Sequence, residues 1–161
     1  GDLSYVSPSL RDSACVTNAF SGDPDDQLVV ANFFLEGTNS FPRDPKRGVY
    51  WLTQSANAGN ICALNQLGLC YLGGEGVMKD DQLGFRLIKI AAEKGLEVAM
   101  MNIAFLASNG RGTPVDYPLA AENLHKAADQ GNADAAYQLA QFYLHGWGVP
   151  QDKNRAFQFF Q

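Results

Sequence analysis

The sequence predicts an all-α fold built from stacked pairs of helices. One observation is a period of 36 residues that runs through most of the 161-residue chain. A second is that apolar residues recur at helical spacing twice in each period, and a third is a glycine-bearing turn between the two runs. The aligned columns are Ala63, Ala99 and Ala135; Leu67, Ile103 and Leu139; Gly68, Ala104 and Ala140; Gly74, Gly110 and Gly146; Gly76, Gly112 and Gly148; Asp44, Asp80, Asp116 and Asp152; and Ala56, Ala92 and Ala128. A fixed period of this length indicates supersecondary units that stack on one another.

Residues 1–26 precede the clear repeats and are predicted to form an N-terminal cap. Leu10, Ala14 and residues 17–20 are compatible with one helix, which residues 22–24 would end. A solenoid needs such a cap because its first repeat otherwise leaves one face open.

Each repeat is predicted to begin with one helix and to turn at a glycine. In the second repeat Ala63, Leu67, Gly68 and Tyr71 fall at helical spacing. The run stops at residues 73–76, where glycine can adopt the positive φ that ends a helix.

The second helix of each repeat is predicted to begin at the recurring aspartate, whose carboxylate can accept hydrogen bonds from the free amides of a helix start. Pro45 follows Asp44, as a first-turn proline should. In the second repeat this helix closes at Gly95, and its apolar stripe is Leu83, Leu87, Ile90 and Ala91.

Four repeats are expected, at residues 27–62, 63–98, 99–134 and, incomplete, 135–161. The second helix of the fourth repeat stops early and leaves three aromatic rings uncovered. We expect that either further chain or a partner covers them. The rings are those of Phe157, Phe159 and Phe160.

These columns resemble the Sel-one-like repeat family, whose repeat reads Ala-x-x-x-Leu-Gly-x-x-Tyr-x-x-Gly-x-Gly-Val, then Asp, then Ala-Ala-x-x-Gly. The second repeat supplies Ala63, Leu67, Gly68, Tyr71, Gly74, Gly76, Val77, Asp80, Ala91, Ala92 and Gly95. The fourth supplies Ala135, Leu139, Tyr143, Gly146, Gly148, Val149 and Asp152. The third departs at Ala107 and Thr113, and the first keeps Asp44, Ala56 and Gly59 but lacks the Gly-x-Gly turn.

The resemblance implies a right-handed α/α superhelix related to tetratricopeptide solenoids, used as an adaptor that binds other proteins and sharing no catalytic residues. Bacterial members of the family often act in the cell envelope, and some resemble immunity proteins that block a secreted lipase-type toxin. The expected partner is therefore another protein, such as a secreted toxin or an envelope protein. The expected place is the bacterial periplasm or cell envelope rather than the cytoplasm.

Composition narrows the classes of partner. The chain is 46% hydrophobic, yet no stretch of about 18 apolar residues could span a membrane, so we expect no membrane insertion. A net charge of −5 and a pI near 4.8 argue against nucleic acid, because phosphate binding needs a basic stripe.

Three cysteines leave at least one without a partner inside the chain. Cys62 and Cys70 lie eight residues apart on one expected helix. At ~1.5 Å per residue they are roughly 12 Å apart, beyond the ~7 Å limit for a disulfide. Cys70 aligns with Phe34, Leu106 and Phe142, so we interpret it as a small buried hydrophobe.

Catalytic and metal motifs are weak throughout the sequence. His125 and His145 fall in different helices without ligand spacing, and no Ser or Cys lies in a nucleophile motif. The glycine turns lack the strand and the lysine of a phosphate loop. We therefore expect no cofactor, no metal and no enzymatic activity.

Charge is distributed unequally between the two helices of each repeat. The expected first helices, residues 27–37, 63–73, 99–109 and 135–145, hold one Asp, Glu, Lys or Arg, which is Glu36. The second helices carry Lys46, Arg47, Arg86, Lys89, Glu93, Lys94, Glu122, Lys126 and Arg155.

If the first helices line the inner curve, as they do in tetratricopeptide solenoids, this contrast predicts a mostly apolar groove that binds a partner. Its predicted residues are Val29, Phe33, Asn65, Leu69, Leu72, Met101, Phe105, Tyr137, Gln141 and Leu144, with Trp147 at the edge. An alternative is a shallower strip in which neighbouring repeats bury Leu72 and Phe105. For Trp147 the alternative is a ring folded onto its own repeat.

The sequence thus predicts a non-enzymatic module that binds a protein through an apolar concave groove. A structural spacer within a longer chain is a second hypothesis. A hydrolase, in which a polar group of the groove acts on a small ligand, is a third.

Overall fold

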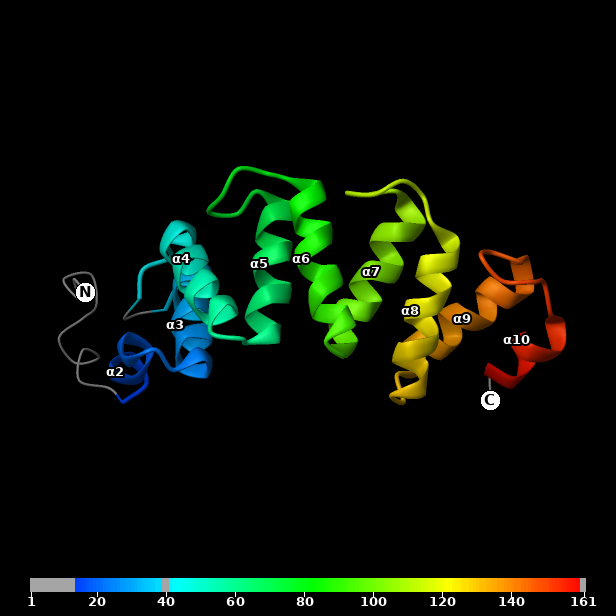
Figure 1. The fold of residues 1–161 in the computed structure, drawn as a ribbon, viewed down its shortest axis with the longest axis horizontal. Coiled ribbons are helices and arrows are strands. Elements are labelled where there is room, and N and C mark those ends of the chain that lie inside the picture. Colours follow the sequence, from blue (N-terminus) through cyan, green and yellow to red (C-terminus); the bar gives the residue numbers. More distant parts are fainter. Residues whose placement is uncertain (1–13, 39–40, 160–161) are drawn as a thin grey trace. The chain divides into compact units, whose positions relative to one another are not determined.

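The computed structural model describes residues 14–38 and 41–159, and all regular secondary structure within them is helical (Figure 1). The all-α class is therefore confirmed. The helices are α2 (Ala14–Ser21), α3 (Pro24–Glu36), α4 (Pro45–Asn57), α5 (Ile61–Gly73), α6 (Asp81–Glu93), α7 (Glu97–Asn109), α8 (Tyr117–Asp129), α9 (Ala133–His145) and α10 (Lys153–Phe159).

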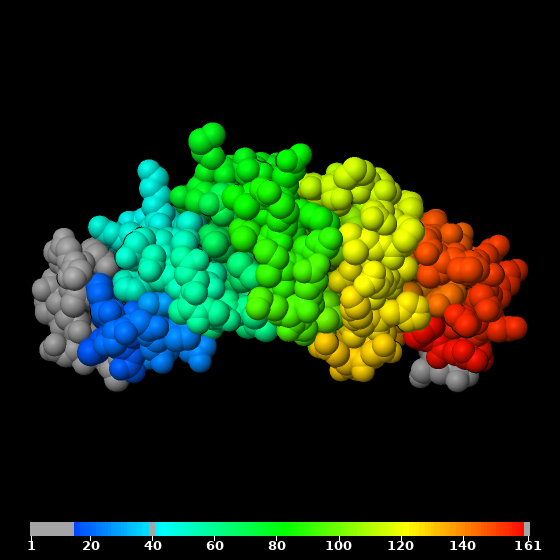
Figure 2. Space-filling view, in the orientation of Figure 1, coloured from blue at the N-terminus to red at the C-terminus, as the bar shows by residue number. Residues whose placement is uncertain are grey.

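The described residues divide into two compact units, one ending at Asp80 and the other beginning at Asp81. Unit 1 contains α2 to α5 and unit 2 contains α6 to α10, and consecutive helices within each unit contact one another. The predicted N-terminal helix is α2, which packs against α3 (Figure 2). Its expected residue Leu10 lies outside the described residues.

Three of the recurring aspartates cap second helices, as the sequence predicts. The carboxylate of Asp44 accepts a hydrogen bond from the amide of Arg47 (3.2 Å), and that of Asp116 accepts one from the amide of Leu119 (2.9 Å). Asp152 caps α10 in the same way. Each cap satisfies amide groups that have no partner inside the helix.

The first helices begin two or three residues before the predicted starts. The prediction placed the start of α5 at the recurring Ala63, but Asn60 caps this helix by accepting a hydrogen bond from the Ala63 amide (2.9 Å). Asn132 caps α9 through the Ala135 amide (2.7 Å), and Asp23 caps α3. The capping side chain sets the start, and it lies outside the apolar stripe that the prediction followed.

The first helices α5, α7 and α9 end where the sequence predicts. Gly74, Gly110 and Gly146 take φ values of 72°, 66° and 72°, in the left-handed region that favours glycine. The chain then turns back, and the amide of Asp80 donates to the carbonyl of Tyr71 in α5 (2.9 Å). Equivalent bonds close the next two turns.

The second glycine of each turn allows a close approach between backbones. A Cβ atom on Gly112 would lie 2.1 Å from the carbonyl oxygen of Asp81, the first residue of α6. No larger residue fits at this distance. The same approach recurs within unit 1 at Gly76 with Pro45 (2.2 Å) and within unit 2 at Gly148 with Tyr117 (2.3 Å).

The core follows the repeat columns. Leu67, Ile103 and Leu139 are all buried, which confirms the predicted core column. Cys70 is buried as well, as its alignment with apolar residues predicts. Small residues at Gly68 and its equivalents are also buried and let neighbouring helices approach closely.

In the first repeat, which lacks the Gly-x-Gly turn, Phe41 lies in the connection between α3 and α4. Its ring is fully buried and packs edge-on against Phe34 (5.1 Å between centroids) and at a tilt against Phe33 (5.0 Å). Its carbonyl accepts a hydrogen bond from the Thr38 amide (2.6 Å). A buried aromatic ring therefore precedes α4 in the first repeat.

The aromatic rings of α10 are only partly bare. Phe159 stacks on Tyr143 with ring centroids 5.8 Å apart, and it meets the edge of His125 at 5.7 Å. The expectation of a bare ring was wrong here, because the helix folds back onto α8 and α9. Phe157 is exposed, and Phe160 lies outside the described residues.

Candidate functional site

The predicted groove residues differ in their exposure. Leu69 and Phe105, which occupy the same repeat position, are 43% and 61% exposed. Val29, Tyr137 and Trp147 are exposed too. The half-buried members are Phe33, Met101, Gln141 and Leu144.

Asn65 and Leu72 are corrections to the prediction, since each is only 5% exposed. Both fall on one helical stripe of α5 with the buried Gly68, which lies three residues after Asn65 and four before Leu72. The prediction assumed a single buried face around Leu67, but α5 buries two opposite faces and leaves a narrow strip with Leu69 open. The shallower alternative thus holds for Leu72, whereas Phe105 is exposed.

In unit 1 the exposed Leu69 lines a pocket of about 200 Å³ between α3 and α5, which we call the α3–α5 pocket. Its lining residues are Asn32, Leu35, Glu36, Gln66, Leu69, Cys70 and Glu75. The sequence prediction missed all of these except Leu69. The one signal that could have pointed to the pocket is Glu36, the single charge in the expected first helices.

The polar groups of the α3–α5 pocket are incompletely paired. The side-chain oxygen of Gln66 is buried and has no hydrogen-bond partner among the described residues. Glu75 forms an ion pair with Arg43, while Glu36 is exposed and forms none within residues 14–38 and 41–159. Burial, with Glu75 as the smaller cause, raises the pKa of the Cys70 thiol to about 11, so this thiol is neutral at physiological pH.

In unit 2 Trp147 belongs to a cluster of aromatic rings. It stacks on His145 (4.6 Å between centroids) and on Tyr117 (6.0 Å), and it meets Phe142 edge-on at 5.7 Å. The ring is thus folded onto its own repeat and onto the start of α8, while part of its surface stays exposed.

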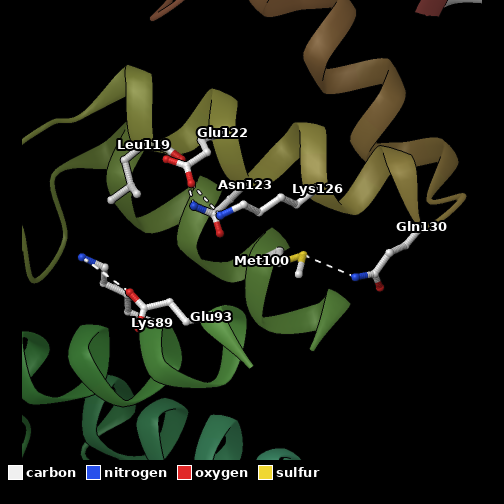
Figure 3. A network of polar contacts seen from close by, with 8 residues as sticks. All are labelled: Lys89, Glu93, Met100, Leu119, Glu122, Asn123, Lys126 and Gln130. Carbon is white, nitrogen blue, oxygen red and sulfur yellow. Dashed lines mark hydrogen bonds and ion pairs between the residues drawn. The ribbon is translucent and has the colours of Figure 1, made fainter. Parts of the chain in front are cut away.

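The second helices α6 and α8 carry paired charges (Figure 3). Lys89 pairs with Glu93 at 4.0 Å, and Lys126 pairs with Glu122 at 2.5 Å, each four residues apart on its own helix. Exposed pairs of this kind contribute about 0.3–0.5 kcal/mol. Gln130 extends toward Met100, with 3.9 Å between its amide nitrogen and the sulfur. This charged face is a well-solvated surface.

The first helices lack the basic residues that this face carries. None of α3, α5, α7 and α9 contains a Lys or Arg. Exposed apolar residues occur on second helices too, such as Ile90 and Phe157. What distinguishes the first helices is that their exposed apolar residues have no Lys or Arg on the same helix.

Potential metal ligands lie apart from one another in the described residues. No three His, Cys, Asp or Glu side chains gather there into a metal-sized cluster. All three cysteines are free thiols. Among the helices of residues 14–38 and 41–159, none combines the length and the apolar character needed to cross a bilayer.

Comparison with known families settles which repeat this is. The model of the Sel1 repeat matches four times, at residues 24–60, 63–96, 98–132 and 133–161. The chain belongs to the Sel1 repeat family. The expected resemblance is confirmed, and the stacked helix pairs within each unit are Sel1 repeats of an α/α solenoid.

Solved structures of Sel1 repeat proteins share this fold. The protein c5321, a protective antigen of uropathogenic Escherichia coli strains with an SLR fold, is 30% identical with a TM-score of 0.86, over 90% of this chain and 31% of that one. A Sel1 repeat protein from Oxalobacter formigenes is 26% identical with a TM-score of 0.83, over 94% of this chain and 60% of that one.

The curated relatives are much longer proteins. Protein sel-1 homolog 2 of Homo sapiens is 29% identical over 102 residues, which cover 60% of this chain and 15% of the relative. The Arabidopsis thaliana protein HRD3A, named as a component of an ERAD-associated E3 ubiquitin-protein ligase, is 31% identical over 114 residues, 69% of this chain and 17% of the relative. The chain thus spans less than a fifth of either relative.

Proposed function

We propose that this chain is a non-enzymatic module that binds a partner protein through the exposed apolar side chains of its first helices. The observation that carries the proposal is the pair Leu69 and Phe105. They occupy the same position in successive repeats, they are both exposed, and their helices contain no Lys or Arg. Exposed apolar side chains without interspersed charge are typical of contact surfaces.

The family supports this proposal. Sel1 repeat proteins mediate protein–protein interactions, and HRD3A is by its name one component of a larger assembly. Solenoid repeats suit such a role because each repeat adds a similar surface to the one before.

The finer role that we propose is that of a bacterial periplasmic or envelope protein, acting as an adaptor or as an immunity protein that inhibits a secreted lipase-type toxin. Two similar solved structures come from bacteria, which supports the bacterial setting. Co-expression with the product of a neighbouring toxin gene tests the immunity role. A stable complex with loss of lipase activity would support it, and full lipase activity beside a folded chain would contradict it.

The spacer remains a second candidate, because the matched region makes up only 15% to 17% of the curated relatives. Capture of partners on the immobilised chain separates the two roles. Wild type is compared with Leu69→Glu/Phe105→Glu by quantitative mass spectrometry. Partners that the double variant loses support binding through the first helices, whereas an unchanged set of captured proteins argues for the spacer.

A further inference from the structure

The α3–α5 pocket of unit 1 has the volume of a side-chain site. Its roughly 200 Å³ is several times the ~30 Å³ that one water occupies in the liquid. The pocket lies beside Leu69, one of the exposed apolar residues through which partner binding is proposed. A segment that covers Leu69 can therefore insert a side chain into it.

Two carboxylates and two side-chain amides line the pocket. The Gln66 side-chain oxygen is buried and has no donor in the described part of the chain, and an unpaired buried acceptor costs free energy until a donor reaches it. Glu36 offers a carboxylate that has no ion pair within residues 14–38 and 41–159. Asn32 adds an amide, while the second carboxylate, that of Glu75, is already paired with Arg43. The open groups therefore include the Gln66 oxygen as an acceptor and the Glu36 carboxylate as a negative charge.

The apolar part of the lining suits an aliphatic stem. Leu35 and Leu69 line the same pocket as Glu36 and Gln66. Lys and Arg side chains combine such a stem with a charged head that donates several hydrogen bonds. Charge-assisted bonds from such a head to a carboxylate are stronger than bonds between neutral groups.

The surrounding charge favours the same ligand. No Lys or Arg occurs in α3 or α5, so no cation on the two pocket helices opposes an incoming one. The contact between Arg43 and Glu75 shows that a guanidinium already pairs with one carboxylate of the pocket.

We propose that the α3–α5 pocket receives a lysine or arginine side chain of the partner protein, with Glu36 as its counter-charge and Gln66 as a hydrogen-bond acceptor. The inference rests on the proposed protein-binding function, because the side chain comes from the partner. It adds that the partner presents a basic residue next to an apolar one, the apolar residue covering Leu69.

The test uses N-acetyl-L-argininamide, which carries the charged head without a partner protein. Titration into the isotope-labelled full chain is followed by the amide resonances of Gln66 and Leu69 in NMR spectra. We expect saturable shifts confined to the pocket, weakened at least fivefold by Glu36→Gln and by an increase in salt. The control is Glu93→Gln, which removes the same charge from the last residue of another helix and should change binding less than twofold.

Neutral probes decide whether charge is recognised. N-acetyl-L-citrullinamide has nearly the same shape without the charge, and N-acetyl-L-norleucinamide is apolar. If either shifts the same resonances as strongly as argininamide, or if Glu36→Gln leaves argininamide binding unchanged, the inference is overturned. Loss of partner binding in Leu69→Glu/Phe105→Glu, together with no argininamide binding, would overturn the pocket and leave the protein-binding function standing.

Discussion

Trp147 stacks on Tyr117, the first residue of α8, with ring centroids 6.0 Å apart and planes at 18°. One repeat earlier the same two positions hold Arg111 and Asp81, whose side chains form an ion pair at 3.2 Å. The middle residue of the Gly-x-Gly turn therefore touches the start of the preceding second helix in both repeats. The contact is kept while its chemistry changes.

The two contacts should therefore have coupling free energies that differ in their dependence on salt. A double-mutant cycle on Arg111 and Asp81 should give a coupling below about 1 kcal/mol that weakens in high salt, because the pair is partly exposed. The cycle on Trp147 and Tyr117 should give about 0.5–1.5 kcal/mol that is insensitive to salt. Urea unfolding at two salt concentrations measures both, and equal salt dependence would contradict the assignment.

Gly112→Ala should lower the free energy of unfolding by about 2–4 kcal/mol, because left-handed strain and overpacking add. The new Cβ would lie 2.1 Å from the Asp81 carbonyl oxygen. Gly95→Ala is the matched control, since Gly95 also has a positive φ but nothing lies within 4 Å of its Cβ position. Denaturant unfolding should show a larger loss for Gly112→Ala, and equal losses would mean that the close approach is unimportant.

Leu67→Ala should cost ~2–5 kcal/mol, as expected of a buried leucine. Leu69→Glu, two residues along α5, should cost far less because its side chain is 43% exposed. Thermal unfolding of the two variants compares the faces directly. If Leu69→Glu unfolds the chain, that residue belongs to the core.

Stability should fall between pH 9 and pH 11 because of two thiols. Burial, as the largest cause for each, raises the pKa of Cys15 and of Cys70 from 9.0 to about 11. The unfolded chain loses these protons near pH 9, whereas the folded chain holds them to about pH 11. The stabilisation is thus complete below pH 9 and disappears as the pH rises through 11.

The variant Cys70→Ala checks this linkage. Its unfolding free energy should decline less steeply than that of wild type over the same pH range, whatever its absolute stability. The exposed Cys62 should meanwhile react first with a thiol reagent at pH 8. Parallel pH curves for the two proteins would contradict the account.

The repeat columns of the sequence predict the helices well, because the ends depend on local chemistry. Gly74 and its equivalents must adopt a left-handed conformation, and Asp44, Asp116 and Asp152 accept capping hydrogen bonds. Asn60 was missed as a cap because it lies outside the apolar stripe.

The candidate site was predicted less completely, since it depends on how many faces of a helix are buried. The repeat phase identifies the face around Leu67, but it does not show that α5 also buries the opposite face with Asn65 and Leu72. The α3–α5 pocket joins two helices from different repeats, so no single column contains it. Glu36 was visible as an isolated charge, but Gln66 looked like any polar helix residue.

The most direct test of the central claim is the affinity of a captured partner for two matched double variants. The variant Leu69→Glu/Phe105→Glu alters two first helices, at side chains that are 43% and 61% exposed. The matched variant Ile90→Glu/Phe157→Glu alters two second helices, at side chains that are 42% and 64% exposed. A carboxylate buried against an apolar partner without a counter-charge should weaken the complex by several kcal/mol, roughly 100-fold or more in Kd. The account predicts this loss for the first pair and a change below about threefold for the second, with both variants folded. Full affinity in the first pair, or an equal loss in the second, would contradict it.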